Sequence, residues 1–173
     1  MLLSHVRNTN SGFTLIEASV VAALVGTLAV VGVPSFLQMF QRFQTNSAFD
    51  QVRGAVKEAQ LQAIRTSRTC TLTINETNRR ITTATTADNG CLLNTVQLPD
   101  STSIRTAAAD RTVRFNFQGN TNTTQTIVVY NNSTNYNKCL VISNGIGMMR
   151  WGNYTGNPNP SNTLNGDFCN TQQ

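Results

Sequence analysis

The hydrophobic pattern divides the chain into an apolar stretch, an amphipathic stretch and a longer region of short alternating runs. Apolar residues dominate from Phe13 to Val33, where Glu17 is the only ionisable side chain. These 21 residues would form a helix of roughly 32 Å at about 1.5 Å per residue, enough to cross a bilayer core of about 30 Å. The pattern therefore predicts a helix of membrane-spanning length over residues 13–33.

A second stretch, residues 34–69, repeats apolar residues at intervals of three and four, which is typical of an amphipathic helix. Pro34 opens it, and a proline inside a helix removes a hydrogen bond and bends or locally melts the helix. We expect one helix from about Thr14 to Arg68, with a break at Pro34 in the assembled state only. The apolar stripe of its second half consists of Phe36, Phe40, Phe43, Val52, Val56, Ala59 and Ala63.

From Cys70 onward the period changes to the two-residue alternation of β-strands. The run Thr112–Phe117 alternates most clearly and would place Val113, Phe115 and Phe117 on a core face. Strands packed on a helix predict the α+β class, with a small antiparallel β domain over residues 70–152. The segment 153–173 is rich in Asn, Pro and Gly and is expected to be an irregular tail. Further strands are expected at 70–74, 79–86, 126–130, 138–143 and 148–151, with a turn at 88–90.

Composition argues against catalysis and against a metal site. Histidine occurs once, at His5, and no Cys-x-x-Cys spacing is present. Zinc sites use such ligands, and Ser-His-Asp or Cys-His catalysis needs a histidine. The carboxylates are too few and scattered for an acid–base pair. The sequence therefore predicts a non-enzymatic protein with no cofactor and no metal.

Four cysteines allow three disulfide pairings. Order along the chain favours Cys70–Cys91, which would tie the first strands, and Cys139–Cys169, which would pin the tail onto a core strand. Disulfides persist in compartments outside the cytoplasm. Arg7, ahead of the apolar stretch, agrees with a cytoplasmic N-terminus under the positive-inside rule. We therefore expect a single-pass inner-membrane protein whose remaining residues lie in the periplasm or beyond.

The start of the apolar stretch carries a short motif, Gly12-Phe13-Thr14-Leu15-Ile16-Glu17. It resembles the cleavage and methylation motif of class III signal peptides, found in type IV prepilins and in the pseudopilins of type II secretion. The resemblance implies that residues 1–12 are a leader, that a prepilin peptidase cleaves between Gly12 and Phe13, and that Phe13 becomes N-methylated. The alternative is an ordinary uncleaved N-terminal anchor with a chance glycine.

Glu17 would become the fifth residue of the mature chain. An ionisable group inside a membrane-length helix is by default a functional-site hypothesis. In a filament, the Glu17 carboxylate of one subunit would neutralise the N-terminal amine of a neighbour, because burying either charge unpaired is far more costly. The alternative is a solvated carboxylate at the headgroup level.

The order of the later segments resembles the minor pseudopilin group called GspH/FimT. The helix ends in the Ala-rich, Arg-bearing stretch 59–65, a cysteine-bearing strand follows, and Phe115-Asn116-Phe117-Gln118-Gly119 comes next. The resemblance implies a minor pilin or pseudopilin in a type IV pilus or a type II secretion pseudopilus. Its partners would be other pilins or pseudopilins in a helical filament, the inner-membrane assembly platform and inner-membrane lipid.

DNA is the alternative partner, since the net charge is +5 and the pI is about 9.4, which suits a polyanion. Some FimT-type pilins bind DNA through a C-terminal Gly-Arg-x-Arg motif; here the matching place reads Gly147-Met148-Met149-Arg150, without the first arginine. Solvated surface arginines are the commoner explanation of such charges. Adhesion through the Asn/Tyr/Trp-bearing tail is a third, weaker hypothesis. The candidate DNA contacts are Arg79, Arg80, Arg111, Arg114, Lys138 and Arg150.

Overall fold

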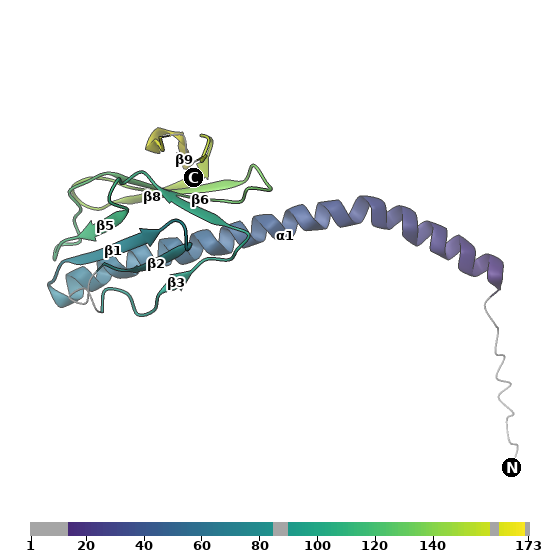
Figure 1. Cartoon of the computed structure of the whole chain (residues 1–173), viewed down its shortest axis with the longest axis horizontal. Helices are drawn as coiled ribbons and strands as arrows, with labels where there is room; N and C mark the ends of the chain where they lie inside the picture. The colour runs from purple at the N-terminus through teal and green to yellow at the C-terminus, as the bar shows by residue number, and fades with distance from the viewer. Residues whose placement is uncertain (1–13, 85–89, 160–162, 172–173) are drawn as a thin grey trace, which may run out of the picture. The chain divides into compact units, whose positions relative to one another are not determined.

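The computed structural model describes residues 14–84, 90–159 and 163–171. The expected cleavage site at Gly12 and Phe13 and most of the expected turn at 88–90 lie outside these residues. The chain divides into two compact units, Met1–Gln38 and Met39–Gln173. Figure 1 follows the elements along the chain, which begin with one long helix and continue with β-strands.

Helix α1 spans Leu15–Thr66 and contains 52 residues. It begins after Thr14, whose side-chain oxygen accepts a hydrogen bond from the Glu17 backbone N–H at 3.3 Å, as an N-cap residue does. It ends where Ser67 adopts a left-handed conformation at φ 51°, a common way to stop a helix. Pro34 lies within the continuous helix, so a break there remains a proposal for the assembled state.

The buried face of α1 starts at Thr45. The predicted stripe is confirmed at its C-terminal end, where Val52, Val56, Ala59 and Ala63 are fully buried. The three phenylalanines at its start are exposed in the single chain, so their burial against another surface stays a prediction. They are exposed because the strands cover only the later turns of the helix, where alanine and valine allow close packing. The exposed fractions are 62% for Phe36, 49% for Phe40 and 67% for Phe43.

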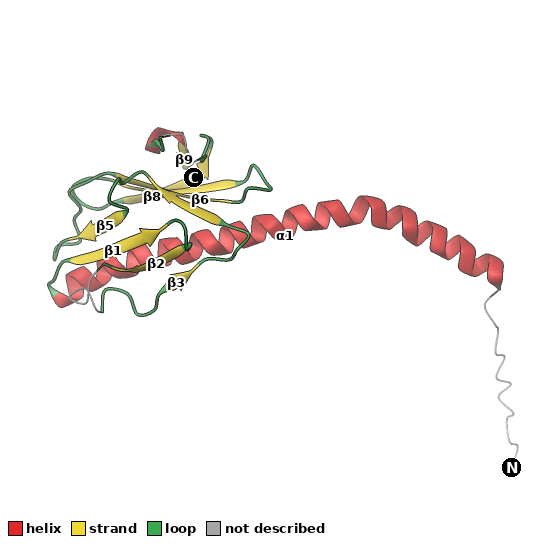
Figure 2. Ribbon diagram, viewed as in Figure 1, coloured by secondary structure: helices red, strands yellow, loops and turns green. Residues whose placement is uncertain are grey.

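Two antiparallel sheets follow the helix, in agreement with the predicted α+β class (Figure 2). The first sheet has the order β3-β2-β1-β5 and the second the order β4-β6-β7-β8-β9. Sequence patterning did not predict the short strands β3 and β4. The first sheet comprises β1 (Cys70–Asn75), β2 (Arg80–Thr83), β3 (Val96–Gln97) and β5 (Thr112–Phe115). The second comprises β4 (Ser103–Thr106), β6 (Gln125–Tyr130), β7 (Asn137–Ile142), β8 (Met149–Tyr154) and β9 (Cys169–Thr171).

The second sheet is buried on both faces. One apolar cluster joins the buried face of α1 to residues of both sheets, including Ile127 and Leu140. A second cluster contains Val128 and Val141, which alternate with the first set along the same strands. All six residues of β6 are therefore buried, because neighbouring side chains on a strand point to opposite faces.

The C-terminal segment is what covers the second face. It was expected to be irregular over 153–173, but β8 extends to Tyr154 and β9 pairs with β8. Leu164 and Cys169 belong to the second cluster. A Cβ atom at Gly152 would lie 1.8 Å from the Asn170 carbonyl oxygen, so only glycine allows β9 to come this close.

Strand β5 ends two residues earlier than its alternation predicts. Phe115 is fully buried, whereas Phe117 is 56% exposed, so the predicted core position of Phe117 is wrong. The Asn116 side-chain oxygen accepts hydrogen bonds from the N–H groups of Gln118 and Asn120, each at 2.9 Å. An asparagine side chain that binds the backbone ahead of it favours a turn over a strand.

Both disulfides join the cysteines that chain order favoured. Cys70 is bonded to Cys91, and Cys139 to Cys169. The first links β1 to the loop between β2 and β3, and the second links β7 to β9. No described cysteine is free.

Removing the second disulfide is expected to destabilise the fold and release the tail. The Cys139→Ala/Cys169→Ala variant should lose about 3 kcal/mol of unfolding free energy, because the bond closes a loop with a sequence separation of 30. Urea denaturation measures this loss, and hydrogen exchange should show faster exchange in β9. The Cys70→Ala/Cys91→Ala variant is the control: it should lose similar stability but leave β9 protected. Equal protection of β9 in both variants would contradict the proposed pinning.

Candidate functional site

The exposed apolar part of α1 is the most distinctive surface of the first unit. Every large apolar side chain described from Leu15 to Val33 is exposed, and the helix is long and apolar enough to cross a membrane. Its hydroxyl groups bond to the helix itself: Ser19 donates to the Ile16 carbonyl at 2.7 Å and Thr27 to the Leu24 carbonyl at 2.8 Å. Glu17 is left as the ionisable group of this segment.

The arginines considered for DNA binding are dispersed. Arg79 precedes β2, Arg114 lies on β5 and Arg150 lies on β8, in two different sheets.

Each of these arginines also has a partner within the fold. Arg79 pairs with the carboxylate of Asp100, and Arg150 donates to the Gly166 carbonyl at 2.9 Å. Arg80 donates to the Gln97 side chain at 3.0 Å. The Arg114 guanidinium lies 3.5 Å from the Thr71 hydroxyl. The Arg111 guanidinium lies 3.7 Å from the Glu76 carboxylate. Lys138 lies over the Tyr136 ring at 5.0 Å from its centroid. These contacts favour structural roles over a shared binding patch.

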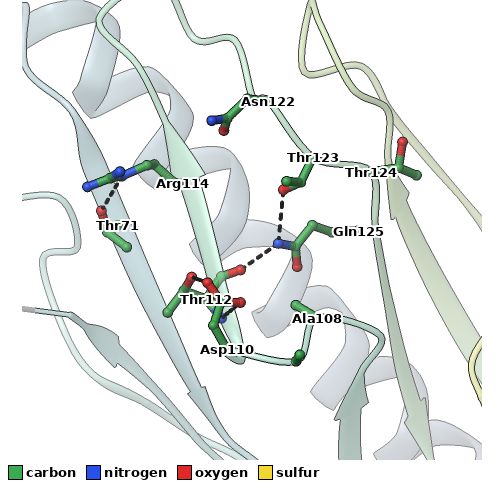
Figure 3. Close-up of a pocket in the computed structure, with 10 residues that line it drawn as sticks. Thr71, Ala108, Asp110, Thr112, Arg114, Asn122, Thr123, Thr124 and Gln125 are labelled. Carbon is green, nitrogen blue, oxygen red and sulfur yellow. Dashed lines mark hydrogen bonds between the residues drawn. The ribbon is translucent and has the colours of Figure 1, made fainter.

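A cavity of about 710 Å³ lies beside Arg114, between β5 and the start of β6. Figure 3 shows Arg114 turned toward Thr71, and Gln125 reaching toward Thr112. The Gln125 amide donates to the Thr112 carbonyl at 2.6 Å. Eight of the ten lining residues have polar side chains, including one carboxylate and one guanidinium, with no histidine or cysteine among the described lining residues.

Asp110 is the acidic member of this lining. The Thr112 hydroxyl donates to its carboxylate at 2.6 Å and the Thr112 N–H at 3.2 Å. These hydrogen bonds, chiefly that of the side chain, lower the pKa of Asp110 below its ordinary value. A carboxylate held ionised in this way is suited to hold a turn, and unsuited to donate a proton.

One structural residue was not singled out by the sequence patterns. Gln60, on α1, donates to the Gly119 carbonyl at 2.9 Å and to the Gly147 carbonyl at 3.1 Å. Gly147 has φ +64°, and a Cβ atom there would lie 2.4 Å from the Gly119 carbonyl oxygen. Gln60 thus joins the helix to two glycine turns. Its only sequence signal is a polar side chain within the Ala-rich stretch 59–65.

Trp151 is held by the same helix. The Arg53 guanidinium lies 3.5 Å from the centroid of the Trp151 ring, a cation–π contact. This contact holds the Trp151 side chain against α1. The tryptophan considered for adhesion is therefore partly engaged within the fold.

Comparisons with known proteins relate the chain to secretion components. The sequence model of the family described as type II transport protein GspH matches residues 48–145. Among solved structures, the minor pseudopilin EpsH from the Type 2 Secretion System of Vibrio cholerae is similar, with 18% identity and a TM-score of 0.47. That similarity covers 61% of this chain and 92% of EpsH. No curated protein sequence matches the chain.

Proposed function

The chain belongs to the family of type II transport protein GspH, and from this premise we propose that it is a minor pilin or pseudopilin. It would be a structural subunit that is assembled, after leader cleavage and N-methylation, into a type II secretion pseudopilus or a type IV pilus. The observation that supports this role is the exposed apolar segment Leu15–Val33 of α1, in which Glu17 is the single ionisable side chain.

Such a helix needs an apolar environment. The side chains from Leu15 to Val33 would first contact inner-membrane lipid, with the N-terminus in the cytoplasm, and later the helices of neighbouring subunits. The exposed phenylalanines Phe36, Phe40 and Phe43 continue this apolar surface beyond the membrane-length segment. The described residues of the chain leave them exposed, and other pilins or pseudopilins would cover them. Extraction from the membrane would require the assembly platform.

Processing by a prepilin peptidase is the first test. We expect N-terminal sequencing of protein from its native host to read N-methylated Phe13 as the first residue. A Gly12→Val variant should keep residues 1–12, since the resemblance places a glycine at the cut. Ser11→Ala, next to it, is the matched control and should be processed normally. A native protein that retains its leader would overturn the proposal.

DNA uptake is the alternative role, supported by the net charge of +5. It predicts salt-sensitive binding of the detergent-solubilised chain to duplex DNA, because Lys and Arg contacts release counterions. Arg114→Gln and Arg150→Gln should then weaken binding and lower its salt dependence, whereas Arg65→Gln, in the last turn of α1, should not. The absence of a gel shift at low salt would exclude this role.

A further inference from the structure

Two adjoining cavities lie at the end of the second sheet where β6 ends, β7 begins and β8 ends. Their volumes are about 590 and 220 Å³. Seven asparagines contribute to their lining, and none of the described lining residues is charged. The two cavities share the residues Asn135, Asn137, Asn157 and Pro158.

The loops that form the walls are fixed by hydrogen bonds. Arg105, on β4, donates to the Pro158 carbonyl at 2.9 Å and to the Asn159 carbonyl at 2.5 Å. On the other wall, the Tyr136 hydroxyl donates to the Asn46 side chain of α1 at 3.0 Å. The cavities are therefore preorganised, which lowers the entropy cost of binding a ligand.

Two polar atoms at the cavities lack partners. The Asn153 side-chain oxygen and the Thr134 hydroxyl are buried from solvent without a hydrogen-bond partner among the described residues. Asn153 lines the larger cavity and Thr134 the smaller. Buried polar groups are usually satisfied, so the walls of both cavities are incompletely hydrogen-bonded among the described residues.

The chemistry of the lining selects the class of ligand. A carboxamide donates and accepts hydrogen bonds without carrying charge, which matches sugar hydroxyl groups. The ring of Pro158 adds apolar surface for the C–H face of a sugar. We propose that these asparagine-lined cavities bind a neutral oligosaccharide. The inference does not depend on assembly into a filament.

Saturation-transfer NMR on the full chain tests the site, with chitotetraose, maltotetraose and cellotetraose as probes. The chain is held in a detergent without a sugar headgroup, because a maltoside would compete. We expect saturable binding of at least one probe, insensitive to salt because no charged side chain lines the cavities. Asn153→Ala and Asn135→Ala should each weaken it by about tenfold, the loss expected for a hydrogen bond with good geometry.

The matched control is Asn122→Ala, which removes an exposed asparagine from the cavity beside Arg114. It should leave sugar binding unchanged. Asn135 is exposed on a loop, so Asn135→Ala decides the matter even if Asn153→Ala fails to fold. No binding of any probe at millimolar concentration would overturn the proposal. So would binding that Asn135→Ala leaves intact, or that falls steeply with salt.

Discussion

Replacing Glu17 by valine is expected to leave membrane insertion intact and to reduce incorporation into filaments by more than tenfold. Insertion should persist because valine is more compatible with lipid than a carboxylate. Incorporation should fall because the N-terminal amine of the neighbouring subunit would be buried without its partner. Breaking a buried ion pair by removing one member costs about 3–5 kcal/mol, and every 1.4 kcal/mol is about a factor of ten in an equilibrium.

The measurement compares membrane and sheared-filament fractions by quantitative mass spectrometry. Glu17→Gln separates charge from size, since it keeps the shape and removes the charge; it should fail in the same way as valine. Thr27→Val is the matched control, because Thr27 donates its hydroxyl hydrogen to its own helix at Leu24 and should be dispensable. Normal incorporation of Glu17→Gln would argue against charge pairing, even if processing at Gly12 occurs as proposed.

Replacing Phe115 by alanine should be the most destabilising single substitution in the β domain. Phe115 is among the largest fully buried side chains and belongs to the cluster that joins α1 to the sheets. Removing a buried phenyl ring costs about 3–5 kcal/mol, because the cavity does not close completely. We expect a loss of this size in the free energy of unfolding, measured by urea denaturation.

Phe117→Ala is an unusually close control, since it makes the same chemical change two residues away. Its side chain is 56% exposed, so the loss should stay within about 0.5 kcal/mol. Equal losses at the two positions would show that Phe117 contributes to the core after all. Such a result would contradict the turn formed by Asn116.

The phenylalanines show which side chains the hydrophobic pattern correctly predicts to be buried and which it does not. Alternation correctly placed Phe115 in the core. It wrongly placed Phe117 there as well, because a periodic pattern does not indicate the residue at which a strand ends. The signal for the end of the strand was in the Asn116 side chain, which binds the following backbone N–H groups. Phe36 and Phe40 show a similar limit on the helix. Their spacing is amphipathic, yet periodicity does not say whether the surface facing them belongs to this chain or to another one.

The candidate sites also differ in whether the sequence alone could identify them. Glu17 was identified from sequence because a single carboxylate in an apolar stretch is conspicuous without any knowledge of contacts. The arginines could not be assessed, since Arg79, Arg114 and Arg150 are distant in sequence and only the fold shows that each has its own partner. The asparagine-lined cavities were also hidden, because their walls come mainly from two segments far apart in the sequence, the loop between β6 and β7 and the residues that follow β8.

By itself the sequence determined the long helix, the change to β-structure at Cys70, the favoured disulfide pairs and the family resemblance, because these depend on local periodicity, order and short motifs. Only the tertiary structure decided that the C-terminal segment covers the second sheet, that Gln60 joins two glycine turns, and that the asparagines of two loops face common cavities. These features depend on contacts between residues far apart in the chain. Such contacts form only when antiparallel pairing and apolar burial bring the strands together.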